Sequence, residues 1–132
     1  MIVLDASVMA NLVGDDGQAG RLARTRAAQD PHWAVPDLVD VETVAVLRKR
    51  WRAGDLTARR FRAAVDDLLA FPMDRFATGR LMVRAYELRS NVRPCDAAYV
   101  ALAEGLDGIL LTADTRLSRA PGIRCRVEVL GP

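Results

Sequence analysis

Four acidic residues stand where the chain passes from an apolar segment into a loop or a helix. Asp5 ends the apolar run 2–4 and Asp114 ends the run 109–113, whereas Glu42 and Asp96 lie early in two helical segments. Carboxylates that a fold brings together repel one another, so they must take up protons or bind a cation. Carboxylate oxygens are the ligands that Mg²⁺ and Mn²⁺ prefer. The four acids therefore form a candidate site for a divalent metal ion.

Each acid also has an ordinary structural explanation when it is considered alone. Asp5 and Asp114 could each cap the helical turn that follows, and Asp96 could be favoured near a helix start by the helix dipole. Glu42 could be a solvated helix residue. Because two acids follow buried segments and two begin helices, the set as a whole favours a common site over four separate explanations.

The segment that carries Glu42 is predicted to be helical from Leu38 to about Arg52. Leu38, Val41 and Ala45 recur at helical spacing and predict its buried face. Glu42 borders this predicted face, and we therefore expect its side chain to turn toward the interior or a cleft.

Short apolar runs alternate with helical patterns along the chain. Strands are predicted at 1–4, 33–35, 71–73, 109–112 and 125–129, and helices at 7–13, 18–29, 38–52, 57–70, 79–90 and 94–104, with a helical turn at 115–118. The helices 38–52 and 57–70 are expected to form a hairpin. This alternation predicts a three-layer α/β/α sandwich around a short, mainly parallel sheet. Ligands of such sheets bind beyond the carboxyl ends of the strands, where Asp5 and Asp114 lie.

Composition bounds the class of protein. The chain has 132 residues, of which 51% are hydrophobic, which fits a single domain over 1–132 with one core. No apolar run approaches the ~18 residues that cross a bilayer, and the first residues lack the basic stretch of a secretory signal. We therefore expect a soluble, cytoplasmic protein without a membrane partner.

Cys95 and Cys125 lack a C-x-x-C spacing, and His32 is the only histidine. This excludes the usual zinc sites and favours two free, buried thiols.

Basic residues are concentrated in the predicted hairpin. Between residues 48 and 62 there are seven basic side chains and one acid, although the net charge of the whole chain is only +2. Arginine suits bidentate contacts with phosphate, but the same pattern fits a solvated helix face, and both interpretations stay open. The candidates for phosphate contacts are Arg48, Arg52 and Arg59 in this hairpin and Arg93 close to Asp96. Trp33, Trp51 and Phe61 are either anchors for a protein partner or ordinary core residues.

Several blocks of the sequence resemble the PIN-domain family, and most closely the VapC toxins of bacterial type II toxin–antitoxin pairs. The blocks are Val3-Leu4-Asp5-Ala6-Ser7, Pro36-x-Leu38 leading to Glu42, Asp96-Ala97-Ala98-Tyr99-Val100-Ala101-Leu102-Ala103, and Leu110-Leu111-Thr112-Ala113-Asp114-x-x-Leu117. The resemblance covers nearly the whole chain, and its last two blocks are the most specific.

The resemblance implies a metal-dependent endoribonuclease that acts as the toxin of a toxin–antitoxin pair. Matched residue by residue, Asp5, Glu42, Asp96 and Asp114 would coordinate Mg²⁺ or Mn²⁺, and Ser7 and Thr112 would be supporting hydroxyls. It also implies an RNA substrate, a small VapB-type antitoxin whose C-terminal segment covers the active site, and a homodimer. Some relatives have a further carboxylate near the position of Arg116, so sites with one and with two metal ions both stay open.

Hydrolysis of a phosphodiester needs an activated water, relief of charge on the phosphoryl oxygens and a stabilised leaving oxygen, all of which a divalent ion supplies. We expect Asp5, Asp96 and Asp114 to ligate the principal ion, and Glu42 to ligate it or to orient the attacking water. Attack by metal-activated water, rather than by the ribose 2′-hydroxyl, would leave a 5′-phosphate.

Two other functions fit part of the pattern. A phosphotransfer domain also has an aspartate after its first strand, but receiver-like domains need paired acids and a late lysine, and dehalogenase-like domains need Asp-x-Asp where Ser7 stands. A catalytically inactive PIN-fold module that binds RNA or protein is the other alternative, and the four retained acids argue against it. The sequence has neither the G-x-G-x-x-G nor the P-loop motif of nucleotide-binding domains.

Overall fold

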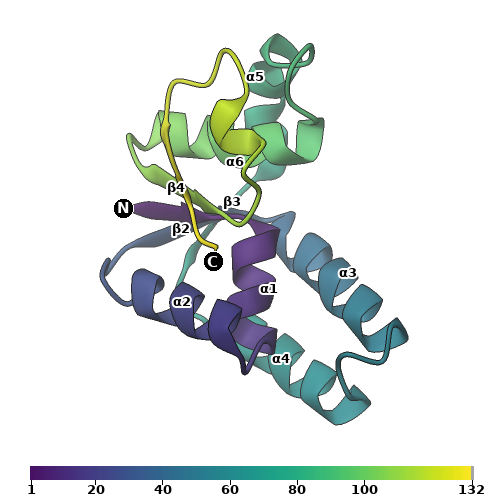
Figure 1. Ribbon diagram of the computed structural model, residues 1–132. Helices are drawn as coiled ribbons and strands as arrows, with labels where there is room; N and C mark the ends of the chain where they lie inside the picture. The colour runs from purple at the N-terminus through teal and green to yellow at the C-terminus, as the bar shows by residue number, and fades with distance from the viewer. Residues whose placement is uncertain (132) are drawn as a thin grey trace.

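The computed structural model describes residues 1–131, which form one five-stranded sheet with helices on both faces (Figure 1). The strands are β1 (Ile2–Leu4), β2 (Trp33–Pro36), β3 (Asp74–Phe76), β4 (Ile109–Thr112) and β5 (Arg126–Val129). The α-helices are α1 (Ala6–Gly14), α2 (Gln18–Ala27), α3 (Val39–Arg52), α4 (Ala58–Ala70), α5 (Met82–Glu87) and α6 (Pro94–Gly105), and the short 3₁₀ helices are η1 (Thr78–Leu81) and η2 (Leu117–Arg119).

The sheet has the strand order β3-β2-β1-β4-β5, and every neighbouring pair is parallel. β1 lies in the centre, where Ile2 is opposite Trp33 of β2 on one side and Ile109 of β4 on the other. The chain therefore extends the sheet first to one side of β1 and later to the other. Such a switch point leaves a crevice at the carboxyl ends of the two strands that flank it, here β1 and β4.

The helices form a layer on each face of the sheet. α1 to α4 lie on one side, where α1 contacts α2, α3 and α4, and α5 and α6 lie on the other side (Figure 1). α6 packs on β1, β2 and β4, and its residues 97–103 are all buried, as expected for a helix that is apolar on every face. The predicted three-layer α/β/α sandwich with a parallel sheet is confirmed, and the predicted hairpin of α3 and α4 is present and packs against α1.

The strand predicted at residues 71–73 is wrong. Phe71 caps the end of α4, and β3 begins at Asp74, where it pairs with Ala34 of β2. Pro72 explains the shift, because proline has no N–H to donate to a neighbouring strand. The predicted helix 79–90 is also divided into η1 and α5, and the helical turn predicted at 115–118 is η2 at Leu117–Arg119.

The buried face of α3 is not the predicted one. Val39, Thr43 and Leu47 are its buried residues, whereas Val41 is 75% exposed and Ala45 is exposed as well. Four valines fall within residues 39–46, so apolar side chains occupy more than one face of the helix and their spacing alone could not select the buried face. Packing against α1 and α4 makes the selection.

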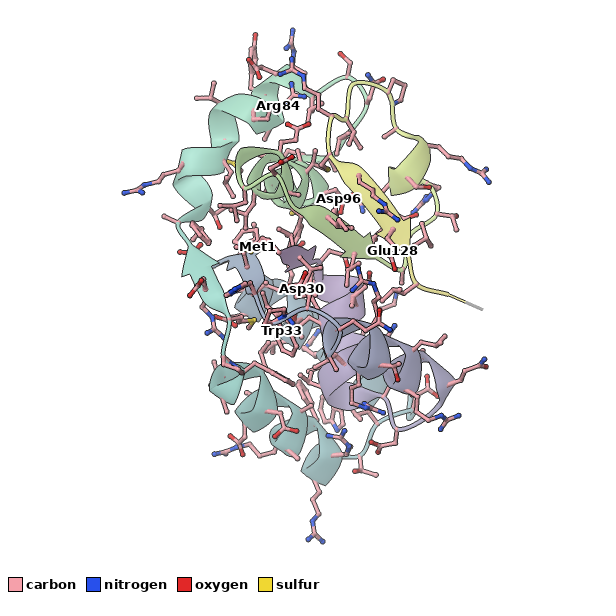
Figure 2. The ribbon with its side chains drawn as sticks, turned by 90° about the vertical axis from the view of Figure 1, so that its left-hand side faces the viewer. Met1, Asp30, Trp33, Arg84, Asp96 and Glu128 are labelled. Atoms are coloured by element: carbon pink, nitrogen blue, oxygen red, sulfur yellow. The ribbon has the colours of Figure 1, made fainter. Side chains whose placement is uncertain are left out.

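Ion pairs join segments that are far apart in the sequence, and Figure 2 labels Glu128, Arg84, Met1 and Asp30, which take part in them. Arg26 of α2 makes two hydrogen bonds to Glu128 of β5, at 2.7 and 3.1 Å. Arg84 of α5 joins α6 through Glu104, and the amino group of Met1 pairs with Asp30 at 2.8 Å. None of the helices within residues 1–131 has both the length and the apolar character needed to cross a membrane.

The turn between α1 and α2 depends on Gly20. A Cβ atom added to Gly20 would overlap the backbone carbonyl of Asp15, so only glycine allows α2 to lie this close to the end of α1.

Candidate active site

All four acids lie at the edge of the sheet where the parallel strands end. Asp5 directly follows β1, Asp114 follows β4 by two residues, and Glu42 lies in the first turn of α3, which follows β2. Asp96 lies in the first turn of α6, which leads into the start of β4 and therefore begins near the opposite, carboxyl edge. The fold thus places the four predicted residues on one side of the molecule.

Asp5 is the most buried of the four acids, with 6% of its surface exposed. Its Oδ1 accepts hydrogen bonds from the Ser7 hydroxyl at 2.5 Å and from the Val8 N–H at 3.0 Å, which caps α1. Its Oδ2 accepts a hydrogen bond from the Thr112 hydroxyl at 2.5 Å. Burial raises the pKa of Asp5, and the nearby charge of Asp96 adds to the rise, although the three hydrogen bonds oppose it.

The hydroxyls of Ser7 and Thr112 connect the ends of β1 and β4. The Ala113 N–H donates to the Ser7 Oγ at 3.0 Å, and the Asp114 N–H donates to the Thr112 Oγ1 at 3.0 Å. Each hydroxyl therefore donates to the Asp5 carboxylate and accepts from the loop after β4. This network fixes the backbone of Asp114 relative to Asp5.

Asp96 and Asp114 face the same cavity, which has a volume of about 300 Å³. Each of them also accepts hydrogen bonds from an exposed arginine close in sequence. Arg93 reaches Asp96 Oδ2 at 3.3 Å, and Arg116 reaches Asp114 Oδ1 at 3.3 Å. Hydrogen bonds from the side chain and the backbone N–H of Arg116 lower the pKa of Asp114. The two arginines line this cavity together with the two acids.

Glu42 meets α6 rather than the cavity shared by Asp96 and Asp114. It is half buried, and its Oε1 accepts a hydrogen bond of 2.6 Å from the hydroxyl of Tyr99. The Cys95 thiol, one helical turn before Tyr99, also lies beside Glu42, and partial burial together with this carboxylate raises the pKa of Cys95. Both cysteines are free, as predicted, but the prediction that they are buried is wrong, because Cys95 is exposed and Cys125 is only partly buried.

Within residues 1–131, no three Asp, Glu, His or Cys side chains converge closely enough to hold a metal ion in the conformation described. The carboxylates instead face the hydroxyls of Ser7, Thr112 and Tyr99 or the guanidinium groups of two arginines. Electrostatic coupling nevertheless links Asp5 to Asp96, and both Glu42 and Asp5 act on Tyr99. The structure therefore arranges the acids as neighbours around one edge without bringing their oxygens together.

The arginines predicted to contact RNA fall into two groups. Arg93 lies in the cavity beside Asp96, whereas Arg48, Arg52 and Arg59 are exposed on the α3–α4 hairpin. Arg52 lies ten residues after Glu42 on the same helix, which corresponds to about 15 Å at 1.5 Å per residue. These three make no ion pair within the part of the chain that the structure describes. The hairpin arginines are therefore free for a ligand, and Arg52 lies far along α3 from Glu42.

Two residues at this edge were not predicted to belong to the site, Tyr99 and Arg116. Tyr99 follows Asp96 by three residues, which places both on neighbouring positions of one helix face. It is also the only polar side chain in the buried run 97–103, and a buried phenol needs a hydrogen-bond partner. Together, this spacing and the need for a partner could have identified Tyr99 as a residue of the site from the sequence. Arg116 is exposed, and no pattern in the sequence singled it out as a partner of Asp114.

The fold of this chain is found in several solved toxin structures. Mycobacterium tuberculosis VapC20, described as a sarcin–ricin loop cleaving toxin, aligns with a TM-score of 0.73 at 20% identity, over 94% of this chain and 97% of that one. VapBC2 from Rickettsia felis, solved bound to a DNA fragment from its promoter, aligns with a TM-score of 0.70 at 14% identity, over 99% and 100% of the two chains. At these identities the comparison shows a shared fold.

Sequence comparison is more specific. Ribonuclease VapC9 of Mycobacterium tuberculosis is 38% identical over 130 residues, which make up 98% of each chain. Ribonuclease VapC3 of the same organism is 36% identical over 119 residues, which cover 90% of this chain and 86% of the relative. The family model described as PIN domain matches residues 2–123. The chain therefore belongs to the PIN domain family and, within it, to the VapC ribonucleases.

Proposed function

We propose that this chain, as one PIN-like nuclease domain over residues 1–132, is a metal-dependent endoribonuclease and the toxin of a toxin–antitoxin pair that acts in the cytoplasm. The observation that carries the proposal is the position of four carboxylates around the carboxyl edge of the sheet, at the β1/β4 switch point. The names of the related ribonucleases support RNA as the substrate. In this proposal Asp5, Glu42, Asp96 and Asp114 hold Mg²⁺ or Mn²⁺.

The residues at this edge fit a hard divalent cation. The ligand set consists of carboxylate oxygens, which Mg²⁺ and Mn²⁺ favour. Burial and the charge of Asp96 raise the pKa of Asp5, so its ionised form lacks a full compensating charge. Asp96 and Asp114 pair only with exposed arginine side chains, whose ion pairs are weak and easily exchanged for a cation.

The chemistry follows from the positions of these groups. A divalent cation at this edge would supply charge relief for the phosphoryl oxygens and would favour ionisation of an attacking water. The Ser7 and Thr112 hydroxyls hold the Asp5 carboxylate in one orientation. Glu42 ligates the cation or orients the water. Arg93, at the rim of the cavity, is placed to contact a phosphate of the bound RNA.

The decisive experiment compares Asp96→Asn with Asp74→Asn. Asp74 is exposed on the edge strand β3, away from the four acids. Purified wild type and Asp74→Asn should cleave RNA in Mg²⁺ or Mn²⁺ but not in EDTA, and should leave 5′-phosphate ends. Asp96→Asn should be folded and inactive. Normal cleavage by Asp96→Asn would refute the assignment of the site, and a 2′,3′-cyclic phosphate product would refute attack by water. RNA binding without any cleavage by the wild type would favour the inactive binding module.

We further propose that an antitoxin of the VapB type docks on the α3–α4 hairpin. An apolar groove of about 470 Å³ runs over this hairpin, and its lining includes Trp51, Phe61, Val65 and Leu69. Solved relatives of the same fold include a toxin–antitoxin complex from Klebsiella pneumoniae, with a TM-score of 0.66. Trp33 is not available as an anchor, because its indole N–H donates to two backbone carbonyls and its ring packs on Phe71.

The antitoxin and a homodimer can be tested together. Co-expression with the product of an adjacent small reading frame should give a complex that survives size-exclusion chromatography, and Leu69→Asp should disrupt it. The exposed apolar side chains Val41 and Val83 are the proposed dimer contacts, and Val83→Asp should convert a dimer of the free chain into a monomer in light scattering.

A further inference from the structure

The hydroxyl of Tyr99 is the one polar group inside the apolar run of α6. The residue is 1% exposed, and its hydroxyl donates a 2.6 Å hydrogen bond to Glu42 Oε1. A phenol is a hydrogen-bond donor and an ionised carboxylate only an acceptor, so Tyr99 donates and Glu42 accepts. A hydrogen bond from a neutral donor to an ionised carboxylate is stronger than one between two neutral groups.

This hydrogen bond connects the two helical layers. α3, which carries Glu42, packs with α1 and α4, whereas α6, which carries Tyr99, packs on the opposite face of the sheet. Tyr99 reaches across at the carboxyl edge, and there it contacts one of the four acids. The position of the Glu42 carboxylate relative to Asp96 is thus set through α6, because Tyr99 and Asp96 lie three residues apart on that helix.

Glu42 is supported differently from the other three acids. Asp5 is held by the hydroxyls of Ser7 in α1 and Thr112 at the end of β4. Asp96 and Asp114 each have an arginine close in sequence. Within residues 1–131 Glu42 forms no ion pair. A glutamate with three rotatable bonds samples many positions unless another group fixes it. Tyr99 supplies that constraint.

We propose that Tyr99 is a positioning residue that holds Glu42 Oε1 and thereby directs Oε2 toward the cation or the attacking water. The inference rests on the proposed nuclease function and assigns a role within it to a residue outside the four acids. Removal of the hydroxyl leaves the ring in place and leaves the carboxylate with only the neighbouring Cys95 thiol. Loss of a group that orients a ligating or water-binding residue typically lowers metal affinity or turnover about 10- to 100-fold.

The chain contains a matched control, because it has only two tyrosines and Tyr86 is 65% exposed on α5. Tyr99→Phe should lower kcat for RNA cleavage about 10- to 100-fold with little change in KM, and Tyr86→Phe should cleave as the wild type does. In the Glu42→Gln background, Tyr99→Phe should have no further effect on kcat. Normal kcat for Tyr99→Phe, or losses that multiply in the double variant, would overturn the proposal.

A second measurement reports the surroundings of Tyr99 instead of the rate of cleavage. The wild-type chain labelled with 3-fluorotyrosine should give two ¹⁹F resonances, of which Mg²⁺ shifts the Tyr99 signal and not the Tyr86 signal. The shift should disappear in Glu42→Gln. A Tyr99 signal that ignores Mg²⁺, in a wild type that cleaves RNA, would contradict the positioning role alone. A wild type that does not cleave RNA in Mg²⁺ would instead contradict the nuclease function.

Discussion

Replacement of Thr112 by valine removes one hydroxyl from the centre of the candidate site and keeps the shape of the side chain. Thr112 is fully buried at the end of β4. Its Oγ1 donates to Asp5 Oδ2 at 2.5 Å and accepts the Asp114 N–H at 3.0 Å. With valine at this position, the buried Asp5 carboxylate loses one hydrogen-bond donor and the Asp114 N–H loses its acceptor.

The size of the effect follows from these two contacts. A hydrogen bond to a charged group contributes about 1.5–3 kcal/mol and a neutral one about 1 kcal/mol. The added methyl group offsets about 1 kcal/mol through its burial. The net loss in the free energy of unfolding is then about 1.5–3 kcal/mol. For a chain of this length such a loss lowers the melting temperature by roughly 5–12 °C.

Urea unfolding near neutral pH, in EDTA and followed by circular dichroism, measures this loss directly. Thr112→Ser is the control, because it keeps the hydroxyl and loses only a methyl group, at a cost of about 1 kcal/mol. The valine variant should be the less stable of the two. The reasoning is refuted if Thr112→Val is as stable as the wild type, or if its effect and that of Asp5→Asn add to within about 0.5 kcal/mol, since contacting residues should couple.

Three further predictions follow from other contacts. Arg26 lowers the pKa of Glu128, so this pair stabilises the fold at pH values above about 4.5. Its contribution is lost as the pH falls through the pKa of Glu128 in the folded state. In urea titrations, Glu128→Gln should therefore lower the free energy of unfolding by about 1 kcal/mol near neutral pH and not at all at low pH. Gly20→Ala should destabilise the chain by about 1–3 kcal/mol, because the new Cβ atom overlaps the backbone carbonyl of Asp15. Gly105→Ala, whose Cβ atom would meet no atom within 4 Å, should not lower the melting temperature in calorimetry. Arg52→Gln should lower the salt dependence of RNA binding by about one unit of slope in fluorescence anisotropy, and an unchanged slope would mean that Arg52 is only a solvated residue.

The parallel sheet and the succession of strands and helices along the chain could be predicted, because buried parallel strands have a simple sequence pattern. β1 is a continuous apolar run followed directly by Asp5, and β4 is an apolar run that ends in Thr112, two residues before Asp114. Such runs fit strands that are covered on both faces. The placement of Asp5 and Asp114 at one edge then follows from the parallel arrangement. The prediction failed at β3, which is short and lies at the edge of the sheet, so its position depends on pairing with β2 more than on its own residues.

The contacts within the site were harder to predict, because they join residues far apart in the chain. The pattern of valines in α3 fits more than one buried face, and packing against α1 and α4 decides which side Glu42 occupies. The Tyr99–Glu42 bond spans 57 residues and the Thr112–Asp5 bond spans 107. A sequence pattern identifies which residue types are present, but the three-dimensional packing decides which of them meet.

The central position of β1 has a consequence for synthesis of the chain. The first strand to leave the ribosome needs β2 on one side and β4, which is made near the end of translation, on the other. At about 5–20 residues added per second, several seconds separate the appearance of these two neighbours. Asp5 lacks the Thr112 hydroxyl throughout that interval. A nascent chain therefore cannot assemble this edge of the sheet before translation is nearly complete.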